Sequence, residues 1–86
     1  MQQEDKKKLI RTAAGKILKK LRGNKSLYIL SMEYEISTSL LNSLERGLKD
    51  PQLTTVFKLS EALGVQASDF VKMIEEELPE GFTLTG

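Results

Sequence analysis

The sequence predicts an all-α protein of five helices, and three observations support this prediction. Apolar residues recur at steps of three and four along most of the chain, which places them on one face of a helix. Glycine and asparagine, which end helices well, stand between these periodic segments. The chain has 86 residues, enough for one small hydrophobic core. We therefore expect one compact helical domain with a short C-terminal tail.

The first helix is expected over residues 6–22, after a polar N-terminal arm of residues 1–5. Gly23 and Asn24 both tolerate left-handed backbone geometry and can end this helix. Several lysines of the helix lie off its apolar stripe. The stripe itself consists of Ile10, Ala13, Ala14, Ile17, Leu18 and Leu21.

The chain is organised around residues 27–46, which are typical of two short helices with a turn between them. Leu30 and Tyr34 lie four residues apart and share one face of the first helix. Leu41 and Leu44 lie three apart and share one face of the second. The spacing therefore predicts a helical hairpin whose two apolar faces meet.

Serines stand where these two helices would begin. Ser26 can cap a helix over residues 27–34, and Ser37 can cap a helix over residues 38–46. Because Leu41 and Leu44 point inward, the second helix presents a polar outer side. This side consists of Thr38, Ser39, Asn42, Ser43 and Arg46.

Two further helices are expected over residues 52–63 and 67–77. Gly47 ends the preceding helix, Pro51 holds the connecting loop extended, and Gly64 separates the last two helices. The residues expected to point inward are Leu53, Val56, Leu59, Leu63, Phe70, Val71 and Ile74.

The C-terminal tail, residues 78–86, is short and contains only two large apolar side chains, Phe82 and Leu84. These are too few to form a core of their own. They therefore either pack on the domain or contact a second subunit, and the sequence leaves both possibilities open.

Composition excludes several classes of site. The chain has no cysteine and no histidine, which excludes disulfides and the usual zinc sites. No catalytic constellation is recognisable, so we expect no enzymatic activity and no cofactor. No apolar run approaches the ~18 residues of a membrane span, and the polar N-terminus is unlike a signal peptide. We therefore expect a cytoplasmic protein.

The net charge of +1 conceals an uneven distribution. Residues 1–50 contain eleven Lys or Arg and six Asp or Glu, whereas residues 51–86 contain two and six. Clustered positive charge is what attraction to phosphate requires. Taken alone, the same pattern also fits a lysine-rich helix face in contact with solvent.

The pattern of residues 27–46 resembles the helix-turn-helix of the lambda-repressor and Cro family (XRE-type regulators), and the resemblance covers roughly residues 18–70. It implies a compact five-helix lambda-repressor-like DNA-binding domain, taken here to span residues 6–77. The features that extend it beyond the hairpin are LERG at 44–47, Pro51, Leu53 and ALG at 62–64.

The resemblance implies sequence-specific binding of double-stranded DNA by a transcriptional regulator, as a symmetric homodimer on a palindromic site. The helix over residues 38–46 would then lie in the major groove. The residues expected to contact bases are Thr38, Ser39, Asn42 and Ser43. Those expected to contact phosphates are Lys25, Ser26, Arg46 and Lys49.

The family also implies an internal ion pair between the Glu of the ERG segment, here Glu45, and a basic residue late in the first helix. Arg22 is the best placed partner and Lys20 the second. The alternative is an exposed Glu45 without a fixed partner.

Two positions depart from the family pattern. Glu35 stands in the turn where the family usually has Gly, so its backbone is expected to be left-handed. Leu27 stands where many members have Gln to support the first base-reading residue, which predicts looser specificity.

A second class of function fits the same fold: an antitoxin or an adaptor that binds a protein partner, with or without DNA, as part of a toxin–antitoxin or phage module. An apolar tail and a half-exposed Leu40 would serve such a contact. A polar outer side on residues 38–46 is also what any surface helix shows. Binding to phosphate weakens steeply with salt, whereas an apolar protein contact does not, so salt dependence distinguishes the two classes.

Overall fold

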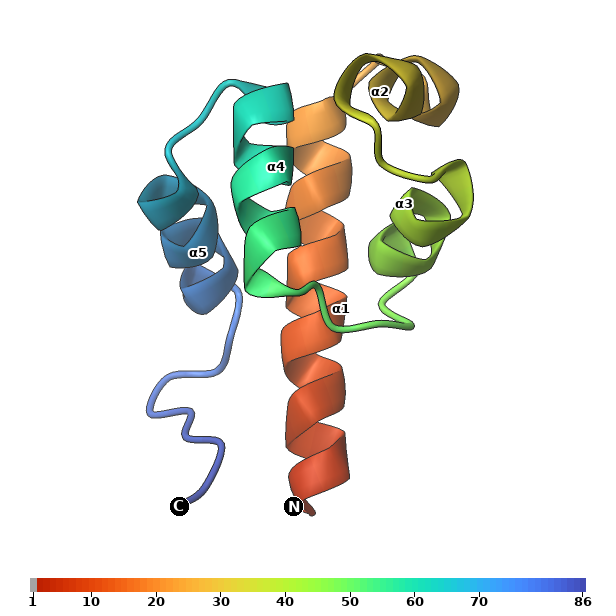
Figure 1. The fold of residues 1–86 in the computed structure, drawn as a ribbon. Helices are drawn as coiled ribbons and strands as arrows, with labels where there is room; N and C mark the ends of the chain where they lie inside the picture. The colour runs from red at the N-terminus through yellow and green to blue at the C-terminus, as the bar shows by residue number, and fades with distance from the viewer. Residues whose placement is uncertain (1) are drawn as a thin grey trace.

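The computed structural model describes residues 2–86, which contain five helices and no strand (Figure 1). The prediction of an all-α fold is confirmed. The helices are α1 (Gln3–Arg22), α2 (Leu27–Tyr34), α3 (Thr38–Glu45), α4 (Leu53–Leu63) and α5 (Ala67–Glu76). None of the helices in this part of the chain is long and apolar enough to cross a membrane.

The helix boundaries agree with the prediction within one residue except at the start of α1. This helix begins at Gln3, so residues 3–5, predicted to belong to a polar arm, form its first turn. Glu4 and Asp5 favour helix here because negative charge stabilises the positive end of the helix dipole. Glu4 also forms an ion pair with Arg11, at 3.1 Å between Oε1 and Nη2.

The long helix α1 is the scaffold of the domain. It contacts both α3 and α5, which lie on opposite sides of it in Figure 1. Helix α4 contacts α2 and α5, and α2 contacts α3, which closes the bundle. The helix-turn-helix pair, α2 and α3, is therefore held by α1 from one direction and by α4 from another.

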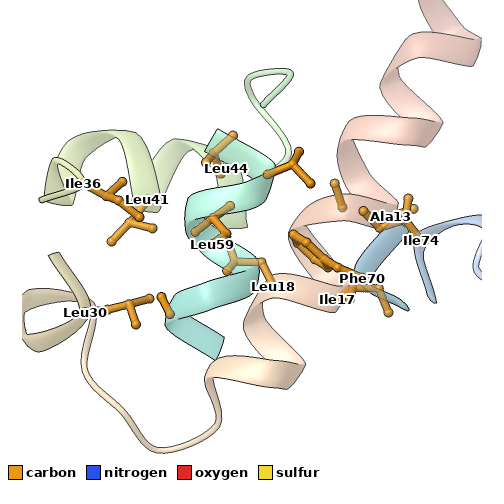
Figure 2. Packing of buried hydrophobic residues seen from close by; sticks show 13 residues of the cluster. Ala13, Ile17, Leu18, Leu30, Ile36, Leu41, Leu44, Leu59, Phe70 and Ile74 are labelled. Atoms are coloured by element: carbon orange, nitrogen blue, oxygen red, sulfur yellow. The ribbon is translucent and has the colours of Figure 1, made fainter. Parts of the chain in front are cut away.

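The core contains side chains from all five helices. Phe70, Leu18, Leu30, Leu41 and Leu59 are the largest fully buried side chains. In Figure 2, Leu18 and Leu59 lie between two groups of neighbours. One group comes from α2, α3 and their connection (Leu30, Ile36, Leu41, Leu44), and the other from α1 and α5 (Ala13, Ile17, Phe70, Ile74).

Two residues predicted to point inward do not. Leu53 is 70% exposed. Three residues fall about 60° short of a full helical turn, so two such steps, from Leu53 to Val56 and from Val56 to Leu59, turn Leu53 away from the buried direction of Leu59. Val71 is 42% exposed, because it lies at the edge of the buried face that Phe70 and Ile74 define. Both predictions were wrong for the same reason, namely that spacing alone does not fix where a helix meets its neighbours.

The tail lies along α1. The Lys6 ammonium donates a hydrogen bond to the Gly86 carbonyl at 3.0 Å, and Lys16 pairs with Glu77 at 2.9 Å. Phe82 and Leu84 are half-buried. Gly86 of the tail thus contacts the start of α1, and both large apolar side chains of the tail are partly covered, which favours packing on the domain over a second subunit as the role of the tail.

Candidate nucleic-acid interface

Both helices of the helix-turn-helix begin with a serine cap, as predicted. Ser26 Oγ accepts a hydrogen bond from the Ile29 amide at 3.1 Å, and Ser37 Oγ accepts one from the Leu40 amide at 2.9 Å. Each cap satisfies one of the free amides of a helix start and contributes about 1 kcal/mol. The two caps therefore define where α2 and α3 start.

The turn between α2 and α3 is made by Glu35 and Ile36. Glu35 has φ 54° and ψ 44°, the left-handed geometry that was predicted, and it is the only non-glycine residue of 2–86 with positive φ. The Ile36 amide donates to the Ser31 carbonyl at 3.3 Å, and the Ile36 side chain is buried. The turn also approaches α4, where Lys58 Nζ donates to the Glu35 carbonyl at 3.4 Å.

The C-terminal end of α3 lies directly on α1 at Gly15. A Cβ at this position would lie 2.5 Å from the Leu44 carbonyl oxygen and 2.7 Å from that of Glu45, closer than side chains allow. Nearby, a Cβ on Gly47 would lie 3.2 Å from Thr12 Cα. The absence of a side chain at Gly15 therefore allows the two helix backbones to touch. Sequence reasoning missed this residue, although the run of small residues in the apolar stripe of α1 was a usable signal.

An ion pair joins the end of α1 to the end of α3. Arg22 Nε and Nη2 donate to the two carboxylate oxygens of Glu45, the second at 2.9 Å. Arg22 Nη1 also donates to the Lys25 carbonyl at 2.7 Å, just before α2. The Glu45 side chain is 8% exposed and that of Arg22 is 17% exposed. Lys20, the second predicted partner, is exposed and makes no such contact.

This pair acts as a positioning contact. The hydrogen bond from Arg22 to Glu45 raises the pKa of the guanidinium, which stays charged. A two-pronged guanidinium–carboxylate contact has fixed geometry. Because Arg22 also binds the Lys25 carbonyl, one side chain joins the ends of α1 and α3 to the start of α2. The ion pair and the contact with Gly15 thus fix the C-terminal end of α3 relative to α1.

The outer side of α3 carries polar side chains that are free to bind a ligand. Thr38, Ser39 and Asn42 are exposed, and Ser43 is half-buried. None of these four side chains takes part in the side-chain hydrogen bonds found within residues 2–86. Hydroxyl and amide groups of this kind can donate to and accept from base edges. The structure therefore brings the four predicted base-contacting residues together on one helix.

The four predicted phosphate-contacting residues are exposed and lie at the ends of the helix-turn-helix. Arg46 and Lys49 follow α3, whereas Lys25 and Ser26 precede α2. Lys25 forms an exposed ion pair with Glu33 at 3.6 Å between Nζ and Oε1, which solvent weakens. Within residues 2–86 no group of three or more acidic side chains could hold a metal ion.

One feature of the helix-turn-helix was not expected from the sequence. Tyr28, Ile29 and Met32 lie on the outer side of α2 and are all more than half exposed. Met32 lies four residues after Tyr28 and three after Ile29, so the three side chains form one apolar face. The apolar composition of α2 was visible in the sequence, but which of its residues would be covered was not.

The helix-turn-helix family model HTH_3 matches residues 18–70, more than half of the chain. The chain belongs to this family. HTH_3 domains are XRE-type, lambda-repressor- and Cro-like DNA-binding domains, so the resemblance identified in the sequence is confirmed over the same residues. The matched range contains α2 to α4 completely, together with the end of α1 and the start of α5. No curated protein and no solved structure matches the chain.

Proposed function

We propose that this HTH_3 protein binds double-stranded DNA in a sequence-specific manner and regulates transcription, with α3 in the major groove. The observation that carries the proposal is the way α3 is presented. Its C-terminal end is fixed on α1 by contact with Gly15 and by the ion pair of Glu45, and its first turn is capped by Ser37. Its outer side chains are polar and make no side-chain hydrogen bond within residues 2–86. A rigid helix with free hydrogen-bonding groups is what base recognition requires.

The proposed contacts divide into two sets according to their place on the fold. The base set lies on the first two turns of α3 and consists of Thr38, Ser39, Asn42 and Ser43. The phosphate set lies at the edges of the hairpin, where the chain would cross the sugar–phosphate backbone, and consists of Lys25, Ser26, Arg46 and Lys49. Hydrogen bonds of the first set would choose the sequence, and charges of the second would supply affinity.

We also propose that the protein acts as a homodimer on a palindromic site. A single α3 of eight residues can reach only a few base pairs, which is too short a site for useful specificity. Two copies related by a two-fold axis would place two such helices in successive major grooves, about 34 Å apart.

The test is a selection from random DNA duplexes, followed by binding measurements at several salt concentrations. We expect a two-fold symmetric sequence to be enriched, with affinity that falls steeply as salt rises. Lys49→Ala should weaken DNA binding. Lys72→Ala, which removes an exposed positive charge on α5, should leave DNA binding unchanged. Binding that is absent, or that enriches no sequence, would exclude the proposal.

A second candidate function, protein binding by an antitoxin or adaptor, is favoured by the outer face of α2. Tyr28, Ile29 and Met32 expose large apolar side chains. Such side chains gain nothing from contact with charged DNA phosphates and are typical of a surface that binds another protein. If this face carries the main function, Met32→Ser should abolish binding to the partner and leave the salt dependence of any DNA binding unchanged.

A further inference from the structure

We propose that the N-terminal half of α1 lengthens the DNA-binding surface beyond the helix-turn-helix, with Lys8 bound to the sugar–phosphate backbone next to the phosphate that Lys49 contacts. The inference rests on the proposed function and adds to its phosphate set a residue outside the range that the HTH_3 model matches. The ligand is a backbone phosphate of the bound duplex, so this contact supplies affinity without sequence preference.

Most of α1 lies outside the matched range, and this part of the chain is strongly basic. The match begins at residue 18, whereas α1 begins at Gln3. Residues 1–17 contain five Lys or Arg and two Asp or Glu. In Figure 1 the first turns of α1 extend past the loop that joins α3 to α4, and only the tail runs beside them. Such a projecting basic helix attracts DNA phosphates if one of its faces is turned toward the duplex.

The contacts of Thr12 and Gly15 establish which face of α1 is turned toward the helix-turn-helix. A Cβ on Gly47 would lie 3.2 Å from Thr12 Cα, and a Cβ on Gly15 would lie 2.5 Å from the Leu44 carbonyl oxygen. Lys8 lies four residues before Thr12 and seven before Gly15, so all three share one face of α1. Lys8 therefore lies one helical turn beyond the place where the chain after α3 meets α1.

The distance along α1 suits the spacing of backbone phosphates. The four residues from Lys8 to Thr12 correspond to about 6 Å of helix. Successive phosphates of one DNA strand lie about 3.4 Å apart along the duplex axis. Lys49 follows Gly47 by two residues in the loop, at the same end of α3. We therefore expect Lys8 to bind a phosphate one or two positions away from the phosphate that Lys49 binds.

The positive charge at this place is available for a ligand. Lys8 is exposed and takes part in none of the ion pairs found within residues 2–86. Arg11, three residues later, has a side chain that is only 17% exposed, and its Nε is buried without a hydrogen-bond partner in the same part of the chain. Its ion-pair partner, Glu4, is 71% exposed, so solvent weakens that pair. Arg11 thus adds positive potential beside Lys8 that a phosphate would compensate.

The tail leaves this face of α1 uncovered. Lys6 donates to the Gly86 carbonyl and Lys16 pairs with Glu77, so these two lysines hold the tail. Lys6 precedes Lys8 by two residues, which places the two side chains about 200° apart around the helix. The tail therefore lies on the side of α1 away from Lys8. The same division is visible in Figure 1, where α5 and α3 lie on opposite sides of α1.

The first measurement is the affinity of the full chain for the selected duplex at several salt concentrations. Lys8→Gln should lower the salt slope by about one unit per bound copy. If the variant and the unmodified protein bind equally near ~1 M salt, this slope corresponds to about fivefold weaker binding per copy at ~0.15 M. Lys20→Gln is the matched control, because it removes an exposed lysine about 120° away on the same helix, and it should leave the slope unchanged.

Glu4 provides a test of the opposite sign. It lies four residues before Lys8 on the same face of α1 and would therefore lie close to the bound backbone. Since a carboxylate repels phosphate, Glu4→Gln should strengthen binding at least about twofold. Asp5→Asn removes the same charge about 100° away around the helix and should have a smaller effect. A gain from one variant and a loss from another cannot both arise from impaired folding.

The second measurement identifies the phosphate. Duplexes are prepared in which one phosphate at a time is replaced by an uncharged methylphosphonate. At one position per half-site, neutralisation should weaken the unmodified protein about fivefold and leave Lys8→Gln unaffected. The same scan with Lys49→Gln should identify a different position, one or two phosphates away. A general loss of folded Lys8→Gln protein would instead lower binding at every position alike.

The outcomes separate this contact from the proposed function. If Lys49→Gln lowers the salt slope and Lys8→Gln does not, the proposed function stands and the contact of α1 fails. The contact also fails if no phosphate loses its effect in Lys8→Gln, or if Lys20→Gln lowers the slope equally, since net charge alone would then account for the result. If no duplex is bound, both proposals fail.

Discussion

Replacement of Gly15 by alanine should destabilise the protein, although alanine is the better helix former. In an ordinary helix interior the change stabilises by about 1 kcal/mol. Here the new Cβ would lie 2.5 Å from the Leu44 carbonyl oxygen, and roughly 0.9 Å of separation is needed to restore an ordinary 3.4 Å contact. The Leu44 oxygen is not free to move, because it accepts the hydrogen bond from the Gly47 amide that closes the end of α3.

The magnitude follows from these two opposed effects. Overpacking against backbone atoms costs about 1–3 kcal/mol, and the lack of any flexible neighbour places this site near the upper limit. After the gain in helix propensity, the net loss is about 2 kcal/mol. For a domain of this size each 1 kcal/mol shifts Tm by roughly 4–8 °C, so we expect a decrease of about 8–16 °C.

The assay is thermal and urea unfolding followed by circular dichroism. The matched control is Lys19→Ala, an exposed change in the same helix, which should stay within about 0.5 kcal/mol of the unmodified protein. A Gly15→Ala protein with an unchanged or higher Tm would refute the reasoning, since it would mean that α1 and α3 do not touch at this residue.

Three further predictions concern the turn, the ion pair and the tail. Glu35→Gly should raise stability by up to about 1 kcal/mol in thermal unfolding, because glycine adopts the left-handed geometry without strain; a clear loss would mean that the turn is built differently. Glu45→Ala should cost about 3 kcal/mol in urea unfolding, because it leaves Arg22 partly buried without its partner; a loss no larger than that of Glu33→Ala would contradict the structure. Deletion of residues 79–86 should lower Tm by a few degrees and leave the mass measured by sedimentation unchanged at every concentration; a change in the monomer–dimer equilibrium would assign the tail to the subunit contact.

The sequence was sufficient for those parts of the fold that depend on local pattern. The five helices follow from apolar periodicity, the serine caps follow from residue type, and the left-handed Glu35 follows from the family pattern, which has Gly at this position. The contact between Arg22 and Glu45, implied by the family resemblance, is also present. Each of these features is determined within a few residues, or by a pattern that a whole family shares.

The features that could not be predicted depend on how helices meet. Nothing in the periodicity of α4 shows that its first turn is uncovered, so Leu53 was placed in the core. The contact at Gly15 depends on the distance between α1 and α3, which residue type alone does not determine. The exposed face of α2 is of the same kind, because its largely apolar sequence does not indicate which side a neighbour covers.

The central claim, that the outer side of α3 reads bases while the residues after it bind phosphate, is tested most directly by one set of titrations. Thr38→Ala and Lys49→Ala are each titrated with the selected duplex and with a scrambled duplex at several salt concentrations. Thr38→Ala should lose about 1–3 kcal/mol of discrimination between the duplexes. Lys49→Ala should weaken both duplexes alike and lower the salt slope by about one unit. Equal loss on both duplexes in Thr38→Ala, or binding by the unmodified protein that does not respond to salt, would contradict the account.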